Sequence, residues 1–299
     1  MPDGQTPDVP GKGGGQPRRG RAPGPRDRSR DPRRNDADSG RSLGAPTGAR
    51  APIGLERAKV RAGAPPRPGR DAAAPPRPDL PVDEEPQLPK GVRREIERII
   101  GKNRRADQIA LALSVGAAAI DEDRLDVGLP MLAWAKHEAP RVAAVREAYG
   151  VALYLDEQYP AALSELQAYK RISGKVDQNH LIADCLRALD RGVERVVDAA
   201  AALVAADDAP EDRRGEAAIV WASSLADAGD VGAGRAVLRK YLGRIGAGKA
   251  EHVLRVRYVA AELAERDGDR AEAREQLSSV QAADRDFLDV EERLAALGG

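Results

Sequence analysis

The sequence predicts an all-α fold, and three observations support this prediction. From Val92 onward, apolar residues recur at helical spacing, with almost no alternation of β-branched residues. In the same part of the chain, small residues recur at intervals of 34 positions, which indicates repeated helical hairpins. Before residue 90, proline and glycine are abundant and aromatic residues are absent. We therefore expect a disordered basic tail over residues 1–89 and a helical domain over residues 90–299.

The composition of the tail explains why it should not fold. Residues 1–90 hold 18 of the 22 prolines, 13 of the 30 glycines and none of the nine aromatic residues. Such a segment cannot bury enough apolar surface to offset the chain entropy that folding removes. The other 209 residues contain every Trp, Tyr and Phe, and they are enough for one sizeable fold or an array of repeats.

The net charge of zero hides an asymmetry between the two parts. Residues 1–90 carry 18 Lys/Arg against 12 Asp/Glu, whereas residues 91–299 carry 30 against 36. Multiple arginines can neutralise phosphates, but without aromatic residues to stack on bases, any RNA contact would be nonspecific. A solubilising linker is an equally good interpretation. The tail arginines in question are Arg18, Arg19, Arg21, Arg26, Arg28, Arg30, Arg33 and Arg34.

Three further features bear on the compartment. The single cysteine, Cys185, excludes an internal disulfide and fits a reducing compartment. The N-terminus shows no apolar region typical of a secretory signal. The most apolar run, Ile109–Ile120, is too short to cross a bilayer of about 30 Å. We expect a soluble, cytoplasmic protein without a membrane contact.

The repeat begins with two small residues twelve positions apart, Gly150 and Ala162. Shifting both by 34 positions toward the N-terminus gives Gly116 and Gly128, which are again small. Shifting them toward the C-terminus gives Asp184 and Val196, so the third unit departs from the pattern. Predicted turns occur at corresponding places in five units: Glu122–Leu125, Asp156–Tyr159, Asp190–Val193, Ala228–Val231 and Asp267–Arg270.

This pattern resembles the tetratricopeptide repeat (TPR) family, whose 34-residue units are helical hairpins with small residues where the two helices approach. The resemblance covers roughly residues 108–285 and implies an α-solenoid of about five degenerate units. The large apolar residues beside the small ones would fill the interior, and stacking of neighbouring units would bury their apolar faces. Predicted helices over Lys90–Gly101 and Asp286–Leu297 would cap the two ends, the second with Phe287, Leu288, Val290 and Leu294 turned inward.

The resemblance also implies a concave groove, lined by the first helix of each unit, that commonly binds peptides. No basic or asparagine clamp for a C-terminal carboxylate occurs at the corresponding positions. The face is mostly apolar in units one to three, which suits an apolar or amphipathic helix. That helix could come from a partner, from this chain's own Val92–Ile100, or from a second copy. The predicted groove residues are Leu113, Ala117, Ile120, Glu147, Val151, Tyr154, Leu181 and Cys185.

Motifs for chemistry are weak. Gly243–Ala250 nearly matches a phosphate-binding loop, but it ends in alanine and follows a predicted helix instead of a strand. The three histidines lie in different units and show no metal-ligand spacing, so we expect neither a catalytic site nor a cofactor or metal. The sequence therefore favours a non-enzymatic scaffold or adaptor that binds a helical or extended peptide. The alternative is an RNA- or ribosome-associated protein that uses the tail.

Overall fold

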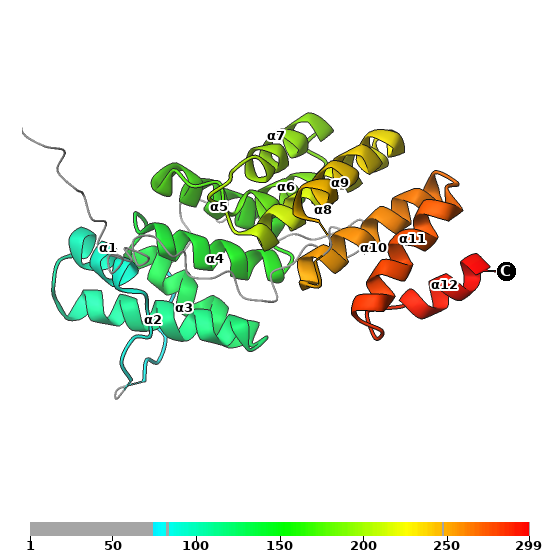
Figure 1. The fold of residues 1–299 in the computed structure, drawn as a ribbon. Helices are drawn as coiled ribbons and strands as arrows, with labels where there is room; N and C mark the ends of the chain where they lie inside the picture. The colour runs from blue at the N-terminus through cyan, green and yellow to red at the C-terminus, as the bar shows by residue number, and fades with distance from the viewer. Residues whose placement is uncertain (1–73, 82–83, 247, 299) are drawn as a thin grey trace, which may run out of the picture. The chain divides into compact units, whose positions relative to one another are not determined.

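The computed structural model describes residues 74–81, 84–246 and 248–298, and within these ranges every regular element is an α-helix (Figure 1). The helices are α1 Lys90–Ile100, α2 Arg104–Asp121, α3 Leu125–Glu138, α4 Ala143–Leu155, α5 Tyr159–Ser173, α6 Asn179–Ala188, α7 Val193–Val204, α8 Glu211–Asp227, α9 Val231–Ile245, α10 Glu251–Arg266, α11 Arg270–Ala283 and α12 Val290–Gly298.

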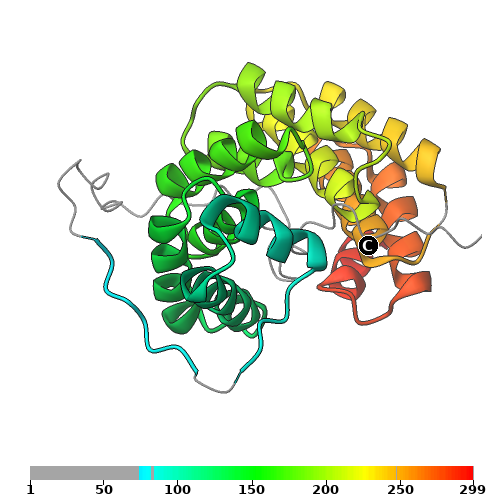
Figure 2. The same ribbon diagram turned by 90° about the vertical axis from the view of Figure 1, so that its left-hand side faces the viewer.

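Ten of these helices form five consecutive hairpins, which confirms the predicted repeat. The hairpins are α2–α3, α4–α5, α6–α7, α8–α9 and α10–α11, and in each the two helices pack on one another. The second helix of each hairpin also packs on the first helix of the next, so the units stack in chain order (Figures 1 and 2). This arrangement is an α-solenoid of TPR-like hairpins, because no single hairpin could bury its apolar side alone.

The turn inside each hairpin closes by the same backbone geometry. In the first unit Asp123 has a φ of 61°, and the next residue, Arg124, donates its N–H to the Ala119 carbonyl at 2.8 Å. Units four and five repeat this bond with Gly229 and Gly268 in the left-handed conformation. These are Schellman turns, in which a residue of positive φ lets the chain reverse while satisfying the last carbonyls of the helix. All five predicted turns lie between the two helices of a unit.

Side-chain caps explain where several helices begin. Asn103 accepts a hydrogen bond from the Ala106 N–H at the start of α2, at 3.0 Å. Asp230 and Asp269 cap α9 and α11 in the same way. Each cap satisfies one of the N–H groups that a helix leaves unpaired at its first turn.

The predicted small residues stand where the two helices of a hairpin come closest. A Cβ atom on Gly150 would lie 2.9 Å from Leu166 Cδ2, and one on Gly128 would lie 2.9 Å from the backbone oxygen of Gly116. Ala162 is fully buried in the same unit. Larger side chains at these positions would push the helices apart, so the physical reason given for the repeat is confirmed.

The third unit shows why Asp184 breaks the repeat. Its left-handed turn residue is Asp190, one position earlier than the interval of 34 predicts, and α6 has only 10 residues. Counting back from the turn, the position of Gly150 is taken by Ala183, which is fully buried. The small residue is therefore present but displaced by one, and Asp184 does not occupy its place. Val196 is a larger buried residue in the second helix, as the sequence indicates.

The two predicted end helices are present, with two corrections to the C-terminal one. α1 packs on α2, and its Glu95 carboxylate accepts a hydrogen bond from the Ala143 N–H at the start of α4, at 2.8 Å. α12 begins at Val290, four residues later than predicted. Phe287 and Val290 are buried, but Leu288 was wrongly assigned to the interior: it is 55% exposed and has a φ of 48°.

Candidate functional site

The two sides of the array differ in how closely their helices approach. The first helices of neighbouring units contact one another along the array, through α2, α4, α6, α8 and α10. The backbones of the second helices of neighbouring units lie farther apart, and side-chain ion pairs such as Lys136 of α3 with Glu165 of α5 span the gap. We call the side formed by the first helices the inner face and the opposite side the outer face. The inner face is the surface on which the sequence places a partner groove.

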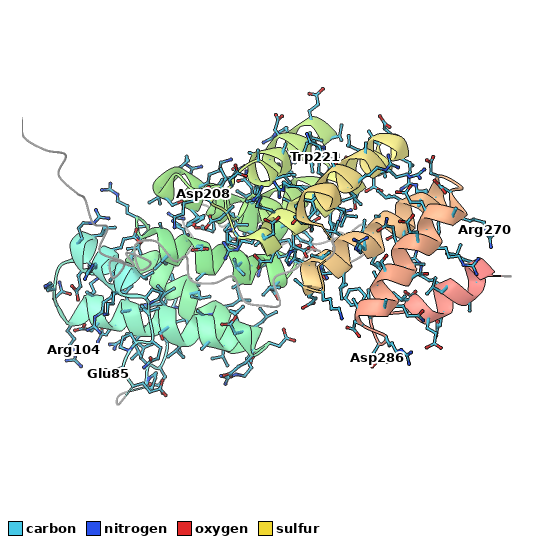
Figure 3. The ribbon with its side chains drawn as sticks, viewed as in Figure 1. Glu85, Arg104, Asp208, Trp221, Arg270 and Asp286 are labelled. Atoms are coloured by element: carbon cyan, nitrogen blue, oxygen red, sulfur yellow. The ribbon has the colours of Figure 1, made fainter. Side chains whose placement is uncertain are left out.

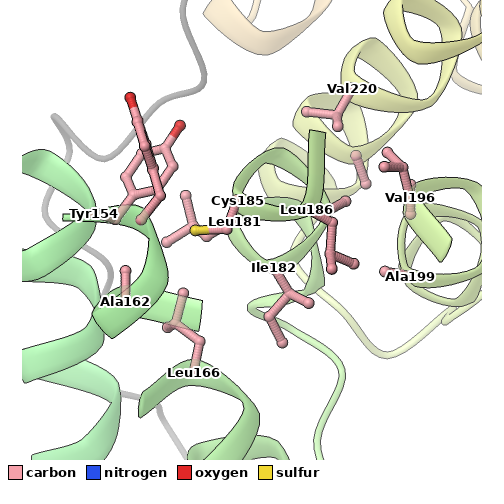
Figure 4. Packing of buried hydrophobic residues seen from close by; sticks show 14 of the residues in the cluster. Tyr154, Ala162, Leu166, Leu181, Ile182, Cys185, Leu186, Val196, Ala199 and Val220 are labelled. Atoms are coloured by element: carbon pink, nitrogen blue, oxygen red, sulfur yellow. The ribbon is translucent and has the colours of Figure 1, made fainter. Parts of the chain in front are cut away.

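The eight predicted groove residues all belong to first helices, but most are not accessible. Leu113, Leu181 and Cys185 are fully buried, and only Ala117 is half-buried. Figure 4 shows Tyr154, Leu181 and Cys185 in one hydrophobic cluster with residues of α5, α7 and α8. That these residues line a groove stays a prediction. In the structure, the buried ones pack in the interior of the array. The other buried members are Ile120, Glu147, Val151 and Tyr154.

A chain of polar contacts that sequence reasoning missed crosses four first helices. The Tyr154 hydroxyl of α4 donates to Asp184 Oδ2 of α6 at 2.7 Å. Asp184, which is fully buried, also pairs with Arg187 at 2.9 Å. Arg187 reaches Asp227 of α8 at 3.5 Å, and Asp227 lies 3.6 Å from Arg266 of α10. These contacts join units two to five. They also give the buried charge of Asp184 the partner that it needs to be stable.

Burial raises the pKa of two side chains in or beside this series of polar contacts, Tyr154 and Cys185. Burial and the Asp184 carboxylate hold the pKa of the Tyr154 hydroxyl well above its usual range, so the hydroxyl remains a hydrogen-bond donor. The same two causes raise the pKa of the Cys185 thiol. Cys185 is therefore a small buried hydrophobe and not an activated nucleophile.

A second polar cluster joins α4, α8 and the loop before α6. Gln178 Nε2 donates to Glu147 Oε1 at 2.7 Å, and Arg213 of α8 lies 3.3 Å from Asp177 Oδ2. The Tyr169 hydroxyl of α5 donates to the same Asp177 at 2.9 Å. All of these side chains are buried or nearly so. Glu147 thus acts as a structural partner between units two and three.

His180 lies beside this cluster and is almost completely buried. Burial, together with the positive charge of Arg213, lowers the pKa of its imidazole from 6.5 to about 3. The side chain is therefore neutral at ordinary pH. His137 is exposed and His252 is half-buried, and they lie in other units.

A third buried contact joins units four and five. Arg255 of α10 donates two hydrogen bonds to Glu216 of α8, at 2.5 and 2.9 Å. The planar guanidinium matches the carboxylate in this two-bond geometry. The sequence predicts a more polar face in these two units, although pattern alone could not show that the two residues meet.

The inner face of the first unit contacts the chain's own N-terminal segment. The Gln87 N–H donates to Ser114 Oγ of α2 at 2.8 Å. Leu80 and Leu88 pack against the hydrophobic cluster that includes Val92 and Ile96 of α1. Residues 84–89 have no regular secondary structure, and Figure 3 labels Glu85 of this segment next to α2. An extended chain can therefore use this face.

The structure also bears on the weaker motifs. The stretch that resembles a phosphate-binding loop begins inside α9, at Gly243, and ends just before α10, so a helix stands where such a loop would follow a strand. Among the described residues, no group of three or more His, Cys, Asp or Glu is placed to hold a metal ion. In that same part of the chain, no helix is both long and apolar enough to cross a membrane. The tail arginines, Arg18 to Arg34, lie outside the described residues.

Comparisons with known proteins found solved structures that resemble this chain at low sequence identity. No protein-family model matches the sequence, and no curated protein matches it. Among solved structures, TTC0263, a thermophilic TPR protein of Thermus thermophilus, is 18% identical over 62% of this chain and 96% of its own, with a TM-score of 0.49. YrrB, a TPR protein with an unusual peptide-binding site, is 15% identical over 66% of this chain and 96% of its own, with a TM-score of 0.45. The turns within each hairpin and the stacking of the hairpins define the array as an α-solenoid.

Proposed function

We propose that this protein is a non-enzymatic scaffold that binds an extended peptide segment of a partner protein on the inner face. The observation that carries the proposal is the hydrogen bond from the Gln87 N–H to Ser114 Oγ, at 2.8 Å. It is a backbone contact of an extended segment with a first helix, and a peptide ligand would make the same kind of contact. We also propose that the helical domain spans residues 90–299 and is preceded by a tail over residues 1–89.

The accessible side chains favour an extended peptide over an apolar helix. Most large apolar residues on the first helices of units one to three are inside the core, so they offer little surface to a helix laid on the inner face. Besides the partly buried Leu155 and Leu189, what remains accessible there includes small or polar residues such as Ser114, Ala117 and Ala148.

The test uses a matched pair of variants on α2. Peptides would be selected from a random displayed library against the full chain, and their affinities measured by fluorescence anisotropy. Ala117 is half-buried on the inner face, whereas Ala118 is exposed. We expect Ala117→Arg to weaken binding by about tenfold or more because the new side chain occupies the peptide's path, and Ala118→Arg to change it by less than about twofold.

Two outcomes would contradict the proposal. Equal affinities for the two variants would show that the peptide does not bind on the inner face. Binding that disappears with RNase treatment or with removal of residues 1–73 would favour the RNA-associated alternative, which at present stays a prediction. Circular dichroism of both variants would establish that each is folded.

A further inference from the structure

The chain just before α1 is extended and lies on α2, and we call its residues 84–88 the leading segment. The Gln87 N–H donates to Ser114 Oγ of α2 at 2.8 Å, and Leu88 is half-buried against the hydrophobic cluster of unit one. Among the described residues, this is the one hydrogen bond between the leading segment and α2. Glu85 is exposed (Figure 3). The described part of the chain therefore holds the leading segment by one hydrogen bond and by packing around Leu88.

α1 is held in place by contacts of its own. Val92 and Ile96 are buried, and the Glu95 carboxylate accepts a hydrogen bond from the Ala143 N–H at 2.8 Å. The Pro89 carbonyl accepts a hydrogen bond from the Val92 N–H at 3.0 Å, so the first turn of α1 closes without the residues before Pro89. The leading segment can therefore leave α2 while α1 stays where it is, with Pro89 as the hinge.

Proline suits a segment that lies along the side of a helix. The backbone groups of a helix are paired with one another, so a chain lying on α2 finds only side chains to pair with its own N–H groups. Pro86 and Pro89 bring no N–H to this surface, and the Gln87 N–H is paired with Ser114. Pro89 has a φ of −55° and a ψ of 140°, the extended conformation that proline-rich chains favour before they bind, so little entropy is lost on binding. The leading segment thus indicates the ligand class that this part of the inner face accepts, an extended proline-rich segment with a leucine.

We propose that the leading segment is a detachable occupant of the inner face of unit one, and that a proline-rich, leucine-anchored segment of a partner binds there by displacing it. This proposal rests on the function proposed above, and it specifies the ligand class and the competitor at that site. Ala117 lies one turn from Ser114 on the same side of α2, and both are half-buried, so a ligand that runs past Ala117 overlaps the leading segment at Ser114. The apparent affinity for a partner is then reduced by the fraction of chains whose own segment is bound.

Occupancy is measured first, by amide hydrogen exchange of the full chain without a ligand. We expect the Gln87 amide to exchange about threefold or more slowly than in a free peptide with the sequence of residues 78–90, because Ser114 Oγ accepts its hydrogen bond. Ser114→Ala should restore the rate of the free peptide, whereas Ser164→Ala, at an exposed position of α5, should not. A Gln87 amide that exchanges at the free rate in the parent chain would overturn the proposal.

Competition is measured next, by fluorescence anisotropy of that same peptide, labelled with fluorescein and added to the full chain. Leu88→Ser removes the apolar anchor of the leading segment, and Gln87→Pro removes its hydrogen-bond donor without changing the core. We expect both of these release variants to bind the peptide about threefold or more tightly than the parent chain, because the face no longer has to be cleared. Glu85→Ser changes an exposed position of the same segment and should bind within about 1.5-fold of the parent. A peptide with serines in place of its two leucines should bind about threefold or more weakly.

Three results of the binding measurement would also overturn the proposal. Equal affinities of the parent and both release variants would show that the leading segment does not compete for the face. A gain in Glu85→Ser as large as in the release variants would reduce the effect to charge repulsion between segment and peptide. Dimers of the parent chain that Gln87→Pro abolishes would place the leading segment on the inner face of a second copy. Circular dichroism verifies that each variant is folded, and Gln87→Pro decides the outcome if Leu88→Ser disturbs α1.

Failure of the function proposed above gives a different pattern. In that case the release variants bind the peptide with the sequence of residues 78–90, but no peptide selected from the displayed library competes with it. The leading segment would then be the occupant of the face, and the face would serve the chain itself instead of a partner.

Discussion

Two glycines of α9 show how the surroundings of a residue decide its effect on stability. A Cβ atom added to Gly234 would lie 2.6 Å from the backbone oxygen of Ala222 on the facing helix α8. A Cβ atom added to Gly243 would meet nothing within 4 Å. The two residues share a helix and a helical conformation, so the difference between them comes from packing alone. Gly234 is needed for the close approach of α8 and α9, whereas Gly243 is not.

The same substitution should therefore have opposite effects at the two sites. We expect Gly234→Ala to lower the free energy of unfolding by about 1–3 kcal/mol, because the new methyl group presses on backbone that cannot move by itself. Gly243→Ala should raise it by up to about 1 kcal/mol, since alanine is the better helix former. Urea denaturation measures both. A Gly234→Ala variant as stable as the parent would show that the hairpin has room to spare.

Buried His180 gives a prediction for pH at the same scale. Its pKa is lowered from 6.5 to about 3 in the folded chain, so between those values the unfolded chain binds a proton that the folded chain does not. Stability must then fall as pH falls, and the contribution between pH 7 and pH 5 is about 2 kcal/mol. Urea denaturation at pH 7 and pH 5 gives the change in the free energy of unfolding between the two pH values. We expect this change to be smaller by about 2 kcal/mol in His180→Gln than in the parent chain. His137→Gln, at an exposed position, is the control and should keep the full difference.

At the scale of the element, the hairpin turn is the unit that repeats. Units one and two place Asp123 and Glu157 in the left-handed conformation, whereas units four and five place glycine there. A non-glycine residue is strained in this conformation because its Cβ atom approaches the carbonyl oxygen that follows. The turns therefore have the same geometry but differ in strain. Exchanging glycine and a non-glycine residue at the position of positive φ should keep the turn and change the free energy of unfolding.

Reciprocal substitutions test this equivalence of the turns. Glu157→Gly should stabilise the chain by about 1 kcal/mol or less, and Gly229→Glu should destabilise it by about 1 kcal/mol. Thermal unfolding monitored by circular dichroism would give both values. If the two changes had the same sign, the turns of units two and four would not be equivalent in energy.

At the scale of the whole array, neighbouring units are joined by contacts that cross between hairpins. The buried pair of Glu216 and Arg255 links α8 to α10, and the chain from Tyr154 to Arg266 links units two to five. In a stacked array most contacts join neighbouring units, so the loss of one such contact should be felt locally. Arg213 of unit four, which lies 3.9 Å from Glu147 of unit two, is an exception. The polar contacts between hairpins therefore decide how many neighbouring helices are destabilised when one contact is removed.

Hydrogen exchange can measure this locality. Glu216→Ala removes the two hydrogen bonds between Glu216 and Arg255, and we expect it to lower the free energy of unfolding by about 3–5 kcal/mol. We expect the loss of amide protection to concentrate in α8–α11, with α2–α5 little changed. Arg105→Ala is the control. Arg105 Nε lies 2.8 Å from Glu138 Oε2, but the Arg105 side chain is exposed, so the free energy of unfolding should fall by less than about 1 kcal/mol. Uniform loss of protection along the chain would contradict a nearest-neighbour array.

The sequence by itself determined the features of this protein that depend on residues close together in the chain. Helical periodicity, the turns and the small residues at Gly116, Gly128, Gly150 and Ala162 are local patterns, and they predicted five hairpins with a helix at each end. The same patterns could not reveal the one-residue displacement that puts Ala183 in place of Asp184, because a short helix leaves no local signal of its true register.

Only the tertiary structure decided which first-helix residues are buried and which polar residues meet. Asp184 and Tyr154 are 30 positions apart, and Glu216 and Arg255 are 39 apart, so no pattern along the chain pairs them. Leu181 and Cys185 belong to the predicted groove by position, yet the stacking of α4, α6 and α8 covers them. Periodicity fixes the direction in which a side chain points on its helix, but burial and pairing depend on how neighbouring hairpins stack.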